Sequence, residues 1–543
     1  MGATNSILGT ARLPTSKGTL QGRSETDPIS KKLVCTRYTR VPYALPPTGA
    51  RRWQKPVPLP AEFSFTSEDG NAGDYTEFGN VCPQPIYKHG SVVLPNDKAA
   101  PPHVRNYSED CLYLNIWVPA GEVPEGGWPV QAYIHGGWLQ VGDAMQSNEH
   151  DPYHLIKDFP RIIVAVSYRL NVFGFLSSPA LEAANFGFWD QRLALEWTFE
   201  NISLFGGNPE NISLGGLSAG AYSTIFQLHY DTYLPEEKRI IKRVFLYSNA
   251  VGVQPDPISS SASEEQFEDL CSRFSISSKL SDTDKIKALR EVPDTKLADE
   301  ILSLKKHTFR AGTDSEFISG SFLKSIYDGS FTSLLKKHNI SIMLGEVANE
   351  EMLYRLVNPA SSYETLISEL NNYYPATMTE GLLNSGIYDI PARNEPSKDK
   401  WRDCFAGIVA DCQVHATVRG FASTLLDGSD PLPLENVFRY RICWRAKGLD
   451  EWLDPSVGLC HAADVPIWTL SGTRAGYDDV DVGRVKEWLK PQMQFLEGKK
   501  VEWGTTSLRE VRRFSSNGDI EIVGDDLWHR GLEVWNCIGK AQL

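Results

Sequence analysis

The sequence predicts an α/β protein in which a mostly parallel, twisted central sheet is flanked by helices. Short apolar segments rich in β-branched residues alternate with helix-like segments through the first half of the 543 residues. Further strand-like segments follow in the second half, and no linker rich in Pro, Gly or Ser separates the two halves. We therefore expect a single domain that spans residues 1–543.

The predicted strands are apolar runs of strand length at residues 130–134, 162–168, 243–249, 341–347 and 436–444. Residues 190–202 show helical spacing instead, with Leu193, Ala194 and Trp197 on one face. Asp190 comes directly before this face and is predicted to cap the helix N-terminus. This order of strands and helices predicts the parallel sheet.

Two long stretches, residues 255–335 and 350–430, depart from this alternation and are mainly helical in pattern. We predict that both are helical insertions packed over the strand ends, where they form the walls of a binding site. An independent helical domain is the alternative. The absence of a linker favours insertions within one domain.

The chain is acidic, with a formal net charge of −14 and a pI of about 5.4. This charge argues against nucleic acid and anionic membranes as partners. No apolar run is long enough to span a bilayer. Residues 1–18 lack the charged region and apolar run of a secretory signal, so we expect a cytoplasmic location.

The nine cysteines do not form the pattern of a disulfide-rich scaffold, and their number is odd. Their spacing does not resemble that of a zinc site either. The sequence therefore predicts no metal and no organic cofactor.

The segment "SLGGLSAGAY", residues 213–222, places Ser218 between Gly216 and Gly220. A strand-like run precedes it and a helix-like run follows, so Ser218 is predicted to lie on a sharp strand-to-helix turn. Glycines at the flanking positions prevent side-chain collisions in such a turn. The N–H group of Ala219, at the start of the helix, can then stabilise an oxyanion. The alternative is a glycine-rich turn with an incidental serine.

Residues elsewhere offer the remaining groups of a nucleophilic site. Residues 133–142, "YIHGGWLQVG", follow a predicted strand, and their two glycines suit a second arm of an oxyanion hole. Glu350 follows the strand at 341–347, and His461 lies in a loop of small residues. His415 is the nearest rival base, but its segment reads as a packed helix. The alternatives are a solvated carboxylate and an incidental histidine.

The sequence resembles the type-B carboxylesterase/lipase family, the α/β-hydrolase group that includes the cholinesterases. The resemblance runs from about residue 33 to beyond residue 468. It rests on several ordered motifs, among them "SEDCLYLNIW" at 108–117, the block at 190–221, "GEVANEE" at 345–351 and "GLCHAADVP" at 458–466. It implies an α/β-hydrolase fold and a serine hydrolase that cleaves carboxylic esters through an acyl-enzyme.

The resemblance also implies roles for individual residues of this sequence. Ser218 corresponds to the nucleophile, Glu350 to the acid and His461 to the base of a catalytic triad. The oxyanion donors of the family correspond to Gly137, Trp138 and Ala219. A disulfide of the family corresponds to Cys82 and Cys111, and a structural ion pair to Arg52 and Glu109, while Cys271 has no evident partner.

Three positions depart from the common pattern of the family. Leu217 stands where a glutamate often precedes the serine, Trp138 replaces a small residue, and Glu351 replaces a glycine. We assign Leu217 and Trp138 to the pocket. Trp138 leaves little room beside the reacting carbonyl, and Leu217 removes a negative charge. Together they predict a small-molecule substrate that is a neutral, unbranched or planar aromatic ester.

Other functions remain as alternatives to a soluble esterase. Lipases of the family carry an amphipathic lid in the loop that corresponds to the segment between Cys82 and Cys111. In this sequence that segment is polar and rich in proline. This segment also lacks Trp and Phe, which argues against a cholinesterase. A thioesterase or lactonase of secondary metabolism and an amidase are further alternatives. Non-catalytic interaction proteins of the family typically lack a triad residue, and here all three are present.

Overall fold

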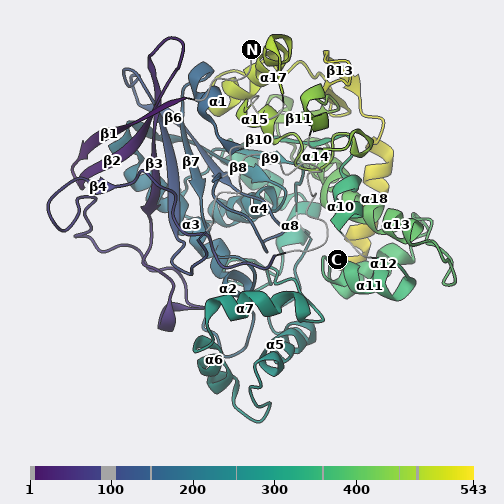
Figure 1. Cartoon of the computed structure of the whole chain (residues 1–543). Helices are drawn as coiled ribbons and strands as arrows, with labels where there is room; N and C mark the ends of the chain where they lie inside the picture. The colour runs from purple at the N-terminus through teal and green to yellow at the C-terminus, as the bar shows by residue number, and fades with distance from the viewer. Residues whose placement is uncertain are drawn as a thin grey trace.

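The computed structural model describes residues 6–86, 106–146, 150–251, 253–357, 360–451, 453–471 and 476–543. Its centre is one twisted mixed sheet with the strand order β1-β2-β3-β5-β7-β6-β8-β9-β10-β11-β12-β13, to which β4 adds by pairing with β2 (Figure 1). The strands are β1 (Ile7–Thr15), β2 (Gly18–Thr26), β3 (Leu33–Pro42), β4 (Gly73–Asp74), β5 (Tyr113–Pro119), β6 (Trp128–Ile134), β7 (Ile162–Val166), β8 (Gly207–Leu217), β9 (Arg243–Tyr247), β10 (Ser341–Val347), β11 (Val437–Ile442), β12 (Glu510–Phe514) and β13 (Ile520–Gly524).

The middle of the sheet is parallel, as the sequence predicts. Every neighbouring pair from β7 through β6, β8, β9, β10 and β11 to β12 is parallel. The two ends are antiparallel, with β1, β2, β3 and β5 at one edge and β13 at the other. The predicted strands at 162–168, 243–249 and 436–444 are present but end sooner than expected, because the chain turns into loops at the carboxyl edge of the sheet.

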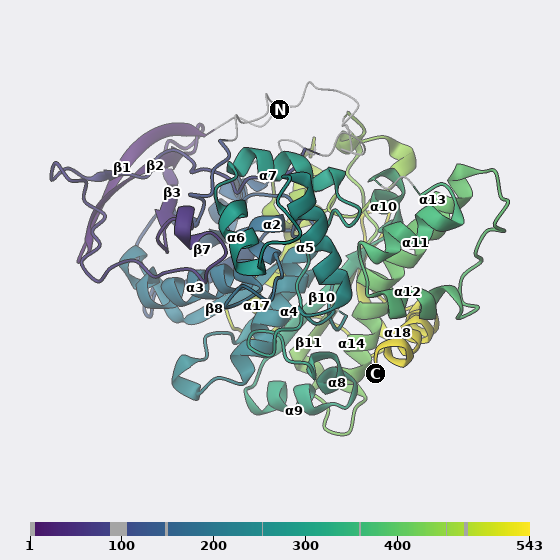
Figure 2. The same cartoon turned by 90° about the horizontal axis from the view of Figure 1, so that it is seen from below.

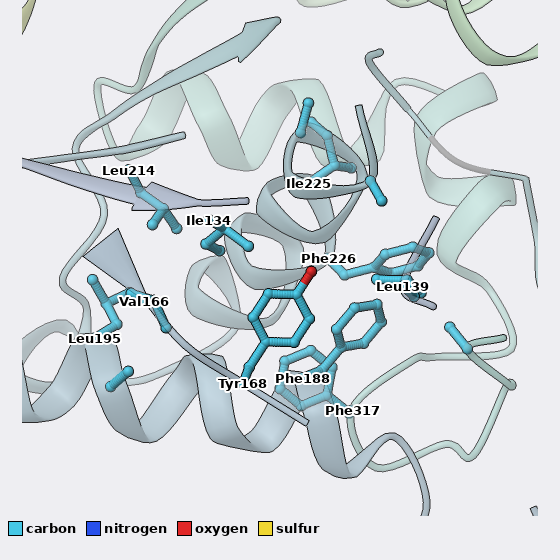
Figure 3. Close-up of a cluster of buried hydrophobic side chains, with 14 of the residues drawn as sticks. Ile134, Leu139, Val166, Tyr168, Phe188, Leu195, Leu214, Ile225, Phe226 and Phe317 are labelled. Carbon is cyan, nitrogen blue, oxygen red and sulfur yellow. The ribbon is translucent and has the colours of Figure 1, made fainter. Parts of the chain in front are cut away.

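Both faces of the sheet are buried, because the side chains of the central strands alternate between two hydrophobic clusters. In β7, Val164 and Val166 belong to one cluster, while Ile163 and Ala165 belong to the other. The first cluster lies against α3 (Phe186–Asn201) and α4 (Ala219–Thr232). Phe188 of α3 belongs to this cluster together with the strand residues Ile134 and Leu214 (Figure 3). The second lies against α1 (Tyr153–Asp158), α15 (Val465–Thr469) and α17 (Asp479–Leu496).

Most of the other helices fall into two groups that are consecutive in the chain, close to residues 255–335 and 350–430 (Figures 1 and 2). The first group contains α5 (Ser261–Arg273), α6 (Asp282–Arg290), α7 (Asp294–Glu300), α8 (Phe322–Tyr327) and α9 (Ser330–Lys337). The second contains α10 (Glu351–Val357), α11 (Tyr363–Asn371), α12 (Ala376–Leu383), α13 (Lys398–Ala410) and α14 (Ala416–Leu426), with a π-helical turn at Asp411–His415 between the last two. Two further helices are α2 (Asn171–Phe175) and the C-terminal α18 (Trp528–Gln542). Within the described ranges, the chain has no helix of the length and apolarity needed to cross a bilayer.

The prediction that Asp190 caps a helix is wrong. Helix α3 begins four residues earlier, with Asn185 at the N-cap position, so Asp190 lies inside the helix and is fully buried. There its two carboxylate oxygens accept hydrogen bonds from Nε and Nη2 of Arg169, both at 2.7 Å. The backbone N–H of Arg169 donates to the same carboxylate at 3.0 Å. Asp190 therefore fastens the segment after β7 to α3.

Candidate active site

Ser218 occupies a strained turn between β8 and α4. Its backbone angles, φ 58° and ψ −121°, lie outside the regions that most side chains adopt. Two glycines make the turn possible, because a Cβ at Gly216 or at Gly220 would lie 2.2 Å or 2.0 Å from the carbonyl oxygen of Ile134. The sequence prediction of a tight strand-to-helix turn is therefore confirmed, and the turn fixes the serine at the edge of the sheet.

The backbone N–H groups of Ser218 and Ala219 differ in their hydrogen bonding. The N–H of Ser218 donates to the carbonyl of Tyr247 at 2.8 Å and so continues the sheet. The next N–H group, that of Ala219, begins α4, where the first N–H groups have no intrahelical acceptor. The positive end of the helix dipole lies at the same place. The turn thus provides one hydrogen-bond donor suited to a negative oxygen beside Ser218.

The loop after β6 lies directly against this turn. A Cβ at Gly136 would lie 2.7 Å from the carbonyl oxygen of Leu217 and 3.2 Å from Cβ of Ser218. Gly137, Trp138 and Leu139 then follow in succession with positive φ angles of 105°, 58° and 67°. Trp138 and Leu139 line the same cavity as Ser218. The loop therefore places the backbone of residues 137 and 138 beside the serine.

Glu350 and His461 form a buried hydrogen-bonded pair at the carboxyl edge of the sheet. The Oε2 atom of Glu350 lies 2.5 Å from Nδ1 of His461, and the side chains are 0% and 4% exposed. The backbone N–H of Val347, at the end of β10, donates to the other carboxylate oxygen at 2.9 Å. These contacts fix both the position of the carboxylate and the orientation of the imidazole ring.

The loops that carry these two residues are held together by backbone pairing. The N–H of Asn349 donates to the carbonyl of Leu459 at 3.1 Å, and the N–H of Leu459 donates to Oδ1 of Asn349 at 3.2 Å. Gly458 has a positive φ of 64°, and a Cβ there would lie 2.2 Å from the same Oδ1 atom. The glycine is thus needed for the close approach that brings Glu350 and His461 together.

The second nitrogen of His461 is directed away from Glu350 and is buried. In the described part of the chain, Nε2 has no hydrogen-bond partner, and it is not bonded to Ser218. The ring lies 5.5 Å from that of Tyr354, whose hydroxyl donates to Gln413 at 3.4 Å. Gln413 lines the cavity that contains Ser218. Tyr354 therefore links the ring of His461 to a wall residue of this cavity, and His461 keeps one nitrogen available as a proton acceptor.

His415, the rival base, has a different environment. Its Nδ1 lies 2.7 Å from Oε2 of Glu346, and both oxygens of that carboxylate also accept from Arg419 at 2.7 Å. Burial alone would lower the pKa of His415, but the charge of Glu346 outweighs it and the pKa is raised. Among the described residues that line the cavity of Ser218, His415 is absent. It belongs to a buried ion network between β10 and α14.

Comparison with known proteins identifies the family of this chain. The sequence model of the carboxylesterase family matches residues 9–480. This chain belongs to the carboxylesterase family. An uncharacterized esterase/lipase of Schizosaccharomyces pombe is 41% identical over 532 residues, which cover 96% of this chain and 95% of the relative. A carboxylic ester hydrolase of Gibberella moniliformis is 37% identical over 519 residues, covering 92% and 91%.

More distant relatives include a cholinesterase of Mus musculus, which is 28% identical over 450 residues. The aligned residues cover 79% of this chain and 69% of that relative. Among solved structures, a PNB esterase superposes with a TM-score of 0.72 at 22% identity, covering 96% of this chain and 99% of that structure. The predicted α/β-hydrolase fold is therefore confirmed. The carboxylesterase described here is a carboxylic ester hydrolase.

Leu217 does not border the serine of this carboxylesterase in the way that the sequence suggested. Its side chain lines a separate cavity of about 410 Å³, together with Tyr133, Tyr247 and Trp468. Successive residues of a strand point to opposite faces, and Leu217, the last residue of β8, points toward the cluster that packs on α15 and α17. Leucine at position 217, where the family often has a glutamate, therefore changes the cavity on the far side of the sheet and not the cavity of Ser218.

Cys82 and Cys111 lie in contact but are not bridged, and all nine cysteines of the chain are free thiols in this structure. Both side chains are buried, and the hydrogen bond with Cys82, followed by burial, raises the pKa of the Cys111 thiol. The predicted proximity is confirmed. The polar segment between them lies mostly at residues 87–105, outside the described residues.

The ion pair of Arg52 and Glu109 is confirmed, with Nε of Arg52 donating to Oε1 of Glu109 at 2.8 Å.

Sequence reasoning missed a second buried carboxyl group, Asp464, which lies three residues after His461 and directly before α15. Its Oδ2 accepts from Nε1 of Trp468 at 2.6 Å, while Oδ1 has no partner within the described part of the chain. Burial raises the pKa of Asp464 to about 6, and the charge of Glu350 adds to this, whereas the Trp468 hydrogen bond opposes it. The only sequence signal was a carboxylate in an otherwise apolar segment, "HAADVPIW".

Asp464→Asn is expected to stabilise the carboxylesterase at alkaline pH. The raised pKa means that the folded state binds the proton more tightly, so Asp464 lowers the free energy of unfolding as the pH rises from about 4 to above 6. The amide oxygen still accepts from Trp468 but does not ionise. In denaturant titrations, the variant should gain up to about 3 kcal/mol over the wild type at pH 8, with no gain near pH 4. An equal difference at both pH values would contradict this assignment.

Proposed function

We propose that Ser218, His461 and Glu350 form the catalytic triad with which this carboxylesterase cleaves carboxylic esters through an acyl-enzyme. One observation carries the proposal. The buried pair of Glu350 and His461 leaves Nε2 as an unpaired acceptor, and Tyr354 links this histidine to a wall residue of the cavity in which a strained serine lies. Hydrogen bonds of catalytic groups are often long before substrate binds, so the absent Ser218–His461 bond is compatible with this role.

In the proposed reaction, Nε2 of His461 accepts the proton of the Ser218 hydroxyl while Oγ attacks the ester carbonyl. Glu350 holds the Nδ1–H tautomer and stabilises the imidazolium that forms. The proton then passes to the departing alcohol, and the acyl group remains on Oγ. A water molecule, deprotonated by His461, attacks the acyl-enzyme, releases the acid and restores Ser218.

The tetrahedral intermediate carries a negative oxygen that needs preorganised donors. We assign this task to the backbone N–H groups of Gly137, Trp138 and Ala219. The loop of residues 136–139 and the start of α4 flank Ser218 from two sides, which supports the assignment. These donors belong to the backbone, so they require no particular side chain.

An assay with p-nitrophenyl esters of increasing acyl length, run beside a thioester and an amide, tests this function. We expect measurable kcat/KM for short oxygen esters and at least about tenfold lower values for the amide, whose leaving group needs stronger acid assistance. A preference for the thioester would favour the thioesterase alternative. Activity that rises only above the solubility limit of a long-chain ester would favour a lipase.

Trp138→Gly is expected to change the selectivity of the enzyme rather than remove its activity. Trp138 lines the cavity of Ser218, so its indole ring takes up volume near the reacting carbonyl. Glycine keeps the backbone donor, tolerates the positive φ and leaves room for a branched group. The ratio of kcat/KM for tert-butyl acetate to that for n-butyl acetate should rise by at least about tenfold. Equal losses on both esters would mean that Trp138 serves only the structure of the loop.

A further inference from the structure

The cavity of Ser218 shares a wall with a second cavity. The second cavity, of about 560 Å³, shares five wall residues with the first, namely Tyr222, Val253, Arg310, Tyr373 and Tyr374. Substrate atoms beyond the reacting carbonyl can therefore extend from the serine toward this shared wall. Apolar and aromatic side chains make up most of the wall, and Arg310 supplies its charged group.

Arg310 has no acidic partner in the part of the chain that the structure describes. Its Nε donates to the backbone carbonyl of Asn372 at 2.7 Å, and its guanidinium lies 4.8 Å from the ring centre of Tyr373. These contacts hold the group in place without neutralising it. Its Nη2 atom is enclosed and has no hydrogen-bond acceptor among the described residues. Burial raises the pKa of Asp256, which lines the second cavity, and the charge of Lys306 opposes this rise only in part.

A second donor on the same wall also lacks a partner. The hydroxyl of Tyr374 is buried and makes no hydrogen bond in the described part of the chain, and the residue is 6% exposed. Burial raises the pKa of Tyr374 well above its usual range, so the hydroxyl keeps its proton near neutral pH. A buried donor without an acceptor costs free energy, and a buried unpaired charge costs more. The Tyr374 hydroxyl and the enclosed Nη2 of the half-buried Arg310 are two donors without an acceptor on one cavity wall, which indicates that a ligand supplies the acceptor.

We propose that Arg310 and Tyr374 bind a carboxylate group of the substrate, so that this enzyme prefers esters that carry a negative charge beyond the reacting carbonyl. The proposal rests on Ser218 being the nucleophile, since Ser218 defines the cavity that Arg310 borders. A carboxylate can accept from two guanidinium nitrogens and from the tyrosine hydroxyl at once. This replaces the neutral substrate predicted from Leu217 and Trp138, because Leu217 lines another cavity.

Half-esters of dicarboxylic acids provide the test. Monomethyl succinate, glutarate and adipate are each compared with the neutral methyl ester in which an isopropyl group replaces the carboxylate. We expect wild-type kcat/KM to favour at least one half-ester over its neutral partner by about 10- to 100-fold, the range of a charge-assisted hydrogen bond. Arg310→Gln should abolish this preference, mainly through KM, and Arg310→Lys should restore part of it.

Lys305→Gln is the matched control, because it removes one positive charge from the same segment at an exposed position. It should retain the wild-type preference, which separates a specific contact from a general effect of net charge. As a binding measurement, free glutarate should inhibit hydrolysis of p-nitrophenyl acetate competitively. Arg310→Gln should raise the inhibition constant by about 10- to 100-fold.

Two results would overturn the proposal. One is a wild type that hydrolyses the neutral esters at least as well as all three half-esters, which needs no variant and leaves the triad untouched. The other is an Arg310→Gln protein that keeps the preference for the half-ester. By contrast, ester hydrolysis by Ser218→Ala at a rate within about tenfold of the wild type would refute the proposed triad itself.

Discussion

Ser218→Ala is expected to lower kcat/KM for ester hydrolysis by about 10⁴- to 10⁶-fold while the protein stays folded. The substitution removes the only hydroxyl that the strand-to-helix turn presents beside the loop of residues 136–139. It leaves the backbone donors in place, so a residual rate above that of water should remain. Progress curves with p-nitrophenyl acetate measure the loss.

Ser223→Ala is the matched control for this variant. Ser223 lies one turn further along α4, and its hydroxyl donates to the carbonyl of Ala219 at 2.8 Å. Removing it should change kcat/KM by no more than a few-fold, because it bonds only within the helix and its surroundings. Circular dichroism of both variants should match that of the wild type. Ser218→Ala with a rate within tenfold of the wild type would exclude Ser218 as the nucleophile.

Glu350→Gln is expected to lower kcat by about 10³- to 10⁴-fold. The amide is similar in shape, and the backbone N–H of Val347 can still donate to its oxygen. It carries no charge, however, so it cannot stabilise the imidazolium, and its NH₂ group favours the wrong tautomer of His461. Kinetics at saturating substrate, measured across a range of pH, report this loss.

The neighbouring residue provides the control for Glu350. Glu351 has the same side chain and begins α10, but its carboxylate makes no contact with His461 in the structure. Glu351→Gln should therefore keep kcat within a few-fold of the wild type. If both variants lost activity equally, the loss would reflect the local charge or the fold of the segment rather than the pair with His461.

The sequence was sufficient for the elements whose patterns depend on local chemistry. The turn at Ser218 could be recognised from its two glycines alone, although the structure shows that both are needed because the carbonyl of Ile134, on β6, lies within about 2 Å of each missing Cβ. The central strands could be predicted since both of their faces are buried and their residues are apolar throughout. The edge strands β1 to β3 could not, because half-exposed strands carry many polar residues.

The features that the sequence did not reveal depend on contacts between distant segments. Asp190 looked like a helix cap, but its partner is Arg169, which lies in the segment after β7. The direction of Leu217 depends on the register of β8 in the sheet. Arg310 and Asp464 are two of many charged residues until the fold encloses one beside a cavity and the other beside the pair of Glu350 and His461.

Covalent labelling tests the central claim most directly. A fluorophosphonate reacts with a serine only where a base activates the hydroxyl and donors stabilise the phosphoryl oxygen, so it reports on the whole proposed site. Mass spectrometry of the intact protein should show one adduct, peptide mapping should place it on Ser218, and Ser218→Ala should remain unlabelled. An adduct on another residue, or active enzyme that stays unmodified at a large excess of probe, would contradict the account.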